Sequence, residues 1–176
     1  ELMPLEQHPL LSGRDVQCPL QLVAPDVVFL PGTIHTIDDL LWLRQCGLEA
    51  AVQKLATSGT PVLGVCGGYQ MLGETLADPE GTESGRSQTV RGLGLLPIQT
   101  VFTDAMHRTQ DTATVTAPQL AGAVLTGYQI HTGRTAVQGV PFCRLADGSA
   151  EGCVKDNVAG TYLRGLFDTG ELTEKL

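Results

Sequence analysis

Residues 64–70, Gly-Val-Cys-Gly-Gly-Tyr-Gln, decide the fold that this chain is expected to adopt. The apolar run at 62–65 predicts a buried strand, and residues 69–76 predict a helix. A cysteine between strand and helix lies on a sharp turn, where flanking glycines let the backbone bend and a substrate approach. The helix N-terminus favours a thiolate, and backbone N–H groups after the cysteine suit a developing oxyanion. The pattern therefore predicts a nucleophile at Cys66.

Two other interpretations of this glycine-rich turn remain open at this point. Cys66 could be a buried structural cysteine, because the Gly-x-Cys-x-Gly pattern is short. The glycines could also bind a nucleotide, but they lack the G-x-G-x-x-G spacing and no acidic residue follows at the expected distance.

The sequence before the elbow predicts a second strand and helix of the same kind. The apolar run at 27–30 ends at Pro31-Gly32, which is typical of a buried parallel strand followed by a tight turn. Apolar residues then recur at helical spacing from 37 to 55, with Thr36 as the expected N-cap. Gly47 is expected to divide this stretch into two helices, and Gly59 to end the second. Two strand–helix units in succession predict a parallel sheet, because parallel strands need a crossover.

The sequence after the elbow is less regular. Residues 78–90 are polar and contain glycines, which is typical of a mobile loop. From residue 93 on, short runs rich in β-branched residues predict several further strands.

Length and composition limit the classes of protein. A chain of 176 residues suits one domain, and its net charge of −8 argues against nucleic acid or an anionic membrane as a partner. No apolar run approaches the roughly 18 residues of a membrane span, and residues 1–4 resemble no signal peptide. The five cysteines are odd in number and form no C-x-x-C, so neither a disulfide framework nor a metal site is expected. A reducing cytoplasm is the simplest location.

Several blocks in the chain resemble the glutaminase domain of cobyric acid synthase, a class I glutamine amidotransferase of the CobB/CobQ-like type. They occur in the family's order between about residues 26 and 170, and the most specific are DLLWLR at 39–44 and CGGYQMLG at 66–73. The other blocks are LPGT at 30–33, DPEG at 78–81, GLGLLP at 92–97, GYQIHTG at 127–133 and GTYL at 160–163.

The resemblance implies a fold and a site. The fold is α/β, with three layers and a mainly parallel, flavodoxin-like sheet, in a domain covering 26–176; residues 1–25 match the family poorly. Cys66 matches the nucleophile that attacks the side-chain amide of glutamine and forms a glutamyl thioester. The resemblance also places Gly32 and Gly67 as backbone donors near the oxyanion.

Tyr128 and His131 lie in a block that the resemblance places near the glutamine pocket. For His131, a strand-end histidine bonded to a neighbouring turn is an equal alternative.

The resemblance also implies partners. In the family, ammonia passes to an ATP-dependent ligase domain, which amidates corrinoid carboxylates in cobalamin biosynthesis. This chain has no G-x-x-x-x-G-K-[ST] motif, so we expect no cofactor here and expect ATP and Mg²⁺ on a ligase domain missing from the chain. The chain is therefore expected to be a fragment of a longer protein or to act with a separate partner.

Two positions depart from the family pattern. The catalytic histidine of the family follows Thr-Tyr-Leu, and here that position is Arg164. Arginine stays protonated at neutral pH, so it favours a thiolate by charge but neither accepts nor supplies a proton as imidazole does. The family's Lys-Asn is replaced by Ile34-His35. The alternative function is therefore a catalytically impaired fragment or remnant with only a binding role.

Overall fold

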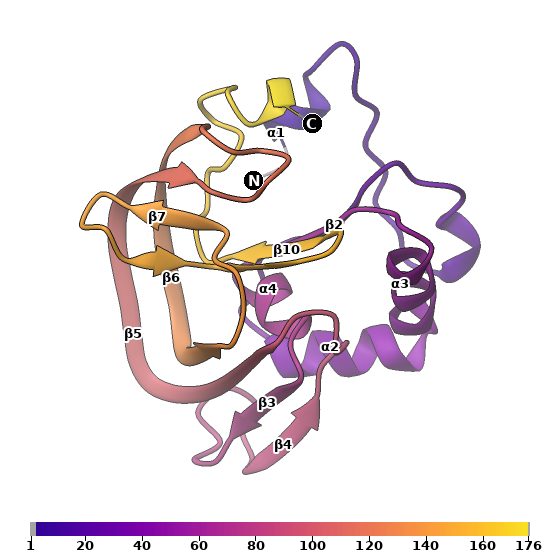
Figure 1. The fold of residues 1–176 in the computed structure, drawn as a ribbon. Helices are drawn as coiled ribbons and strands as arrows, with labels where there is room; N and C mark the ends of the chain where they lie inside the picture. The colour runs from indigo at the N-terminus through magenta and orange to yellow at the C-terminus, as the bar shows by residue number, and fades with distance from the viewer. Residues whose placement is uncertain (1–2, 176) are drawn as a thin grey trace.

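The strand that precedes Cys66 lies inside a small, mainly parallel sheet (Figure 1). The computed structural model describes residues 3–175. The strand order is β1-β2-β10-β9, in which β1 pairs with β2 and β2 with β10 in parallel, and β10 pairs with β9 antiparallel. The bounds are β1 (Val28–Leu30), β2 (Val62–Val65), β9 (Cys153–Lys155) and β10 (Val158–Thr161). All four residues of β2 are buried, as expected for a central parallel strand.

The remaining strands form a second, mainly antiparallel sheet. Its order is β4-β3-β5-β7-β8, and β6 pairs with β5; only the β3–β5 pairing is parallel. The long strands β5 and β6 form a strongly curved ribbon in Figure 1, and their register shifts between Val101 and Met106. The bounds are β3 (Thr75–Asp78), β4 (Gln88–Arg91), β5 (Ile98–Val115), β6 (Val124–Val137), β7 (Cys143–Leu145) and β8 (Ala150–Glu151).

Of the longer helices, α2 packs against both α3 and the short helix α4 of the elbow. The α/β class and the parallel pairing of the first two strand–helix units are confirmed. Gly47 divides the long helical stretch as predicted, with φ at +85°, and Gly59 follows the second helix with φ at +99°. The bounds are α1 (Met3–Glu6), the 3₁₀ turn η1 (Pro19–Gln21), α2 (Thr36–Gln45), α3 (Leu48–Thr57), α4 (Gly67–Met71) and the 3₁₀ turn η2 (Thr173–Lys175).

The prediction that Thr36 caps α2 is wrong. His35 is the N-cap residue, and Thr36 lies inside the helix, where it is buried and its hydroxyl donates to Gln70. The carboxylate of Glu83 supplies the missing cap, since it accepts from the backbone N–H of Ile37 at 3.3 Å. A cap from a distant loop leaves no local sequence signal.

Residues 78–90 are fixed by one carboxylate, contrary to the mobile loop that their composition predicts. Asp78 is fully buried and accepts hydrogen bonds from the backbone N–H groups of Thr82, Glu83 and Ser84 at 2.7–3.1 Å. Burial alone would raise the pKa of Asp78, but these bonds outweigh it and lower that pKa below its ordinary value. The same loop carries the Glu83 cap and so connects the second sheet to α2.

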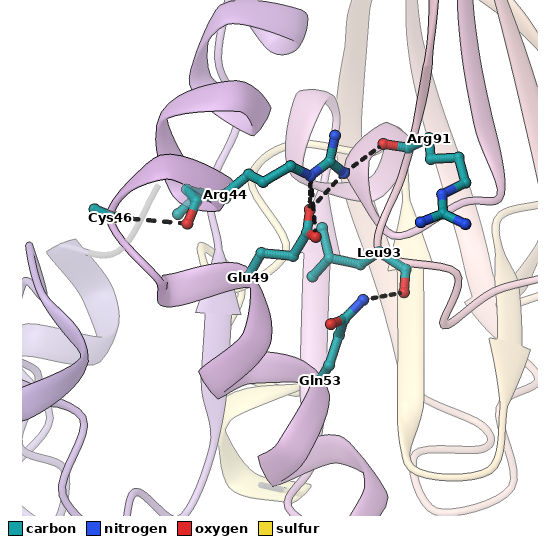
Figure 2. Close-up of polar contacts among 7 residues, drawn as sticks. Arg44, Cys46, Glu49, Gln53, Arg91 and Leu93 are labelled. Carbon is teal, nitrogen blue, oxygen red and sulfur yellow. Dashed lines mark hydrogen bonds and ion pairs between the residues drawn. The ribbon is translucent and has the colours of Figure 1, made fainter.

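Side chains of helices α2 and α3 also form hydrogen bonds with the backbone at the end of β4 and just after it (Figure 2). Arg44 forms an ion pair with Glu49 at 2.6 Å and donates to the carbonyl of Arg91 at 2.7 Å. Gln53 donates to the carbonyl of Leu93 at 2.9 Å. These contacts hold the helical layer against the second sheet beside the site.

Candidate active site

Cys66 occupies a strained turn at the carboxyl end of β2. It is the N-cap residue of α4, with φ at +53° and ψ at −112°, a conformation that non-glycine residues rarely adopt. Strain of this kind persists only where the surrounding structure imposes it, and it gathers at functional sites. The predicted placement of Cys66 between a buried central strand and a helix is confirmed, but the helix predicted at residues 69–76 is wrong in its extent, because α4 ends at Met71 and β3 begins at Thr75.

Glycines around Cys66 allow the backbone segments to approach closely. A Cβ atom at Gly68 would lie 2.1 Å from the carbonyl oxygen of Leu30, and one at Gly64 would lie 2.7 Å from the carbonyl oxygen of Gly68. Backbone atoms at such distances cannot move aside, so only glycine fits both positions. The elbow therefore packs directly on the end of β1, which leads into the turn that contains Gly32.

Arg164 reaches Cys66 from the segment that follows β10. Its Nη2 donates to the Cys66 Sγ at 3.2 Å, and the Cys66 Sγ lies 3.4 Å from the carbonyl oxygen of Ile130, to which the thiol can donate. The backbone of Arg164 is fixed by paired hydrogen bonds with Tyr128, at 2.8 and 3.3 Å. The guanidinium lies so close to Gly32 that a Cβ there would be 3.0 Å from Nη2. The residue at the family's histidine position is thus the direct partner of the sulfur.

The two glycines expected to hold an oxyanion belong to segments that meet beside Cys66. A Cβ at Gly67 would lie 2.6 Å from the Cγ2 of Thr33, the neighbour of Gly32. Thr33 orders this turn, because its hydroxyl donates to the carboxylate of Asp39 and accepts from the N–H of His35. The fold brings both glycines to the elbow, and their role as donors stays a prediction.

The structure separates Tyr128 from His131. Tyr128 is 42 % exposed and is paired with Arg164 through its backbone. The His131 ring instead stacks on Tyr162 at 3.6 Å between centroids, with His107 at 5.1 Å. These three rings line a cavity of about 400 Å³ whose lining includes neither Cys66 nor Arg164. The assignment of Tyr128 to a glutamine pocket fits this arrangement better than that of His131, and both stay predictions.

His131 is held neutral by its surroundings. Burial, helped by His107 and Arg164, lowers the pKa of His131 to about 4. Its Nδ1 atom is buried and has no hydrogen-bond partner among residues 3–175. At neutral pH this imidazole is therefore uncharged.

Replacing His131 with phenylalanine is expected to make the protein more tolerant of acid. The unfolded histidine takes up a proton below its ordinary pKa of 6.5, whereas the folded one does so only near 4. The stability that the neutral His131 contributes to the folded state is therefore complete above pH 6.5 and is lost as the pH falls toward 4. Phenylalanine keeps the stack on Tyr162 and removes this loss, so the drop in urea midpoint between pH 7 and pH 5 should shrink. His35→Phe, which changes an exposed histidine outside this cluster, is the control; an unchanged drop in His131→Phe would contradict the prediction.

Gln70, which the sequence did not single out as functional, links three elements next to the elbow. Its side chain is buried, accepts from the hydroxyl of Thr36, and donates to the Thr132 carbonyl and the Tyr162 hydroxyl, each at 3.0 Å. The only local signal is an amide in an otherwise buried helical turn. Gln70 therefore sets the position of β6 relative to the segment that carries Arg164.

Glu151 was missed as well, and it fixes the end of β10. Its buried carboxylate accepts from the hydroxyl of Thr161, from the N–H of Tyr162 at 2.7 Å and from the Cys143 thiol at 3.4 Å. Burial raises the pKa of Glu151, although the bonds from Thr161, Tyr162 and Cys143 oppose that rise. The carboxylate thus holds the backbone just before Arg164.

The described part of the chain offers no other obvious chemistry. All five cysteines are free thiols. Within residues 3–175, no group of three or more His, Cys, Asp or Glu side chains could hold a metal ion. No helix in that range is long and apolar enough to cross a membrane.

The fold resembles that of solved glutamine amidotransferases. A solved glutamine amidotransferase superposes with a TM-score of 0.68 at 15% identity, covering 99% of this chain and 88% of the other. The structure of PurLQS from Thermotoga maritima gives 0.66 at 17% identity, with the same coverage. At such identities the likeness shows the fold alone, and it confirms the predicted fold class.

The chain belongs to the CobB/CobQ-like glutamine amidotransferase domain family, whose model matches residues 1–172. It is 43% identical over 173 residues to a cobyric acid synthase from Trichormus variabilis, which covers 95% of this chain. It is 38% identical over 188 residues to the corresponding protein of Moorella thermoacetica, which covers 98%. The chain spans only 35% and 36% of these two relatives. The predicted resemblance is confirmed.

Proposed function

We propose that this chain is the glutaminase domain of a cobyric acid synthase and uses Cys66 to release ammonia from glutamine. The observation that carries the proposal is the Cys66 Sγ, placed on a strained elbow with the Arg164 guanidinium 3.2 Å away. A positive charge at that distance can stabilise negative charge that develops at the reacting centre.

In the proposed reaction, the Cys66 sulfur attacks the side-chain carbonyl carbon of glutamine. The carbonyl oxygen becomes an oxyanion, for which the backbone N–H groups of Gly32 and Gly67 are the proposed donors. The carbon–nitrogen bond then breaks, the nitrogen takes up a proton and ammonia leaves, and water hydrolyses the glutamyl thioester to glutamate. Tyr128, beside Arg164, is the proposed contact for the bound amino acid.

The ammonia would be used elsewhere. We propose that an ATP- and Mg²⁺-dependent ligase domain, in a longer chain or on a separate subunit, amidates corrinoid carboxylates in cobalamin biosynthesis. The relatives' greater length, roughly three times that of this chain, supports such a partner. A cytoplasmic location agrees with this chemistry.

A second candidate function follows from Arg164 itself. Guanidinium supplies a proton poorly, so a catalytically impaired domain that binds glutamine or its partner without fast turnover remains the alternative. The two functions differ in the rate of glutamate release, not in the presence of the nucleophile.

Cys66 is expected to be the cysteine most reactive toward a glutamine analogue that carries a chloromethyl ketone in place of the amide. Cys143 and Cys153 should stay unlabelled, because burial raises the pKa of each thiol. Cys18 and Cys46 are partly exposed and should give a slow background. Peptide mass spectrometry measures the labelling, and added glutamine should protect Cys66 alone. Labelling dominated by another cysteine, or without glutamine protection, would count against the proposed site.

A further inference from the structure

The contacts of Arg164 divide the expected reaction into a step that it assists and a step that it does not. Its guanidinium lies against Gly32 and donates to the Cys66 Sγ. Attack by sulfur is helped by a nearby positive charge, and the guanidinium supplies that charge. Breaking the amide bond also needs a proton on nitrogen, and guanidinium holds its protons at neutral pH.

Two neighbouring side chains, those of His131 and Tyr162, are poor replacements for the missing acid. His131 is turned into the cavity that it shares with Tyr162 and His107, and the lining of that cavity excludes Cys66. The Tyr162 hydroxyl is engaged with Gln70 and Thr135, and burial raises its pKa to about 12. The donors that surround the sulfur therefore stabilise anions better than they protonate a leaving group.

We propose that the Cys66–Arg164 pair accepts γ-glutamyl donors whose leaving group departs as a stable anion, such as activated esters, and that it holds the resulting thioester. This inference rests on the proposed function, because it uses the same nucleophile and the same amino-acid pocket. Such donors need no proton on the leaving group, so Arg164 can serve as the partner of Cys66 in their reaction.

The step balances without a proton donor. The Cys66 thiolate forms a bond to the γ-carbonyl carbon, and the electron pair of the C=O π bond moves to oxygen. That pair returns as the carbon–oxygen bond to the leaving group breaks, and the alcohol leaves as its anion with the bonding electrons. The products are the glutamyl thioester on Cys66 and an alkoxide or phenolate, which water protonates. Hydrolysis of the thioester is slow, because Arg164 offers no base to activate water as the family's histidine would.

The test compares two γ-glutamyl donors on the wild-type chain, on Arg164→His and on Cys66→Ala. The probes are glutamine and glutamic acid γ-(4-nitrophenyl) ester, with the buffer rate, including spontaneous cyclisation, subtracted. With the ester, the wild type should release a burst of about one equivalent of 4-nitrophenolate and then slow, as expected when an acyl-enzyme accumulates. The Cys66 peptide should carry the glutamyl group, and Cys66→Ala should give no burst.

The Arg164→His variant distinguishes the inference about ester donors from the proposed glutaminase function. Arg164→His should exceed the wild type at least ~10²-fold with glutamine but less than ~10-fold in the ester burst. An equal advantage of Arg164→His with both probes would overturn the inference and leave the proposed function standing. Absence of Cys66-dependent release in both proteins with both probes would overturn the proposed function itself.

Arg164→Met tests the role of the charge, since methionine keeps much of the apolar stem and the backbone pairing with Tyr128. The inference requires its ester burst to be at least ~10-fold slower than that of the wild type. An unchanged unfolding temperature shows that the variant is folded. A burst as fast as that of the wild type from a folded Arg164→Met protein would overturn the inference.

Discussion

Arg164→Lys and Arg164→His are expected to differ sharply, because only histidine should raise glutamine hydrolysis, at least ~10²-fold above the parent chain. Arg164 contacts the Cys66 Sγ at 3.2 Å. Because the family pattern has its catalytic histidine at this position, a histidine on the same backbone is expected to reach the sulfur. Imidazole accepts the thiol proton and later returns it to the departing nitrogen, which guanidinium does poorly. Glutamate release at neutral pH, with the ATP-dependent partner present in each assay, measures the effect.

The matched lysine variant keeps the positive charge without an imidazole. Equal and high rates in the parent and Arg164→His proteins would show that Arg164 does not disable the site. Inactivity in both would place the defect elsewhere, either in the Ile34-His35 turn or in residues 1–25. A gain with lysine as large as that with histidine would mean that charge geometry, not proton transfer, limits the reaction.

Cys66→Ala in the Arg164→His background is expected to reduce glutamate release by at least ~10³-fold, to the buffer rate. Alanine removes the sulfur, and with it the thioester route. A folded Cys66→Ala protein should still bind glutamine, which separates loss of chemistry from loss of the pocket. Cys153→Ala, which removes another buried thiol, is the matched control and should keep most of the activity. Substantial activity without Cys66 would require a different nucleophile.

The local features of the site could be predicted from the sequence. The strand, cysteine and glycines at 62–68 are contiguous, so the local pattern predicts the elbow. Gly47 could be predicted to break the long helical stretch for the same reason, since its φ of +85° suits glycine. The placement of Arg164 near Cys66 could be predicted because Arg164 follows the Thr-Tyr-Leu block. The parallel pairing of β10 with β2 brings that block close to the elbow.

The contacts between distant segments could not be predicted. Gln70 binds Thr132 and Tyr162, which lie 62 and 92 residues further along the chain. The Glu83 cap on α2 spans 46 residues, and without it Thr36 was the only visible candidate. The orientation of His131 depends on the curvature of β5 and β6, which the alternation of side chains in a strand does not fix.

The most direct test of the account is to find the glutamyl group on the enzyme. The Arg164→His protein is mixed with glutamine labelled in its carbon chain, quenched in acid within its first turnovers, and digested for peptide mass spectrometry. We predict the labelled glutamyl group on the peptide that contains Cys66, absent from Cys66→Ala, with ammonia equal to the bound glutamyl group plus the released glutamate. Glutamate release with no label on Cys66 at any quench time, or label on another residue, would contradict the account.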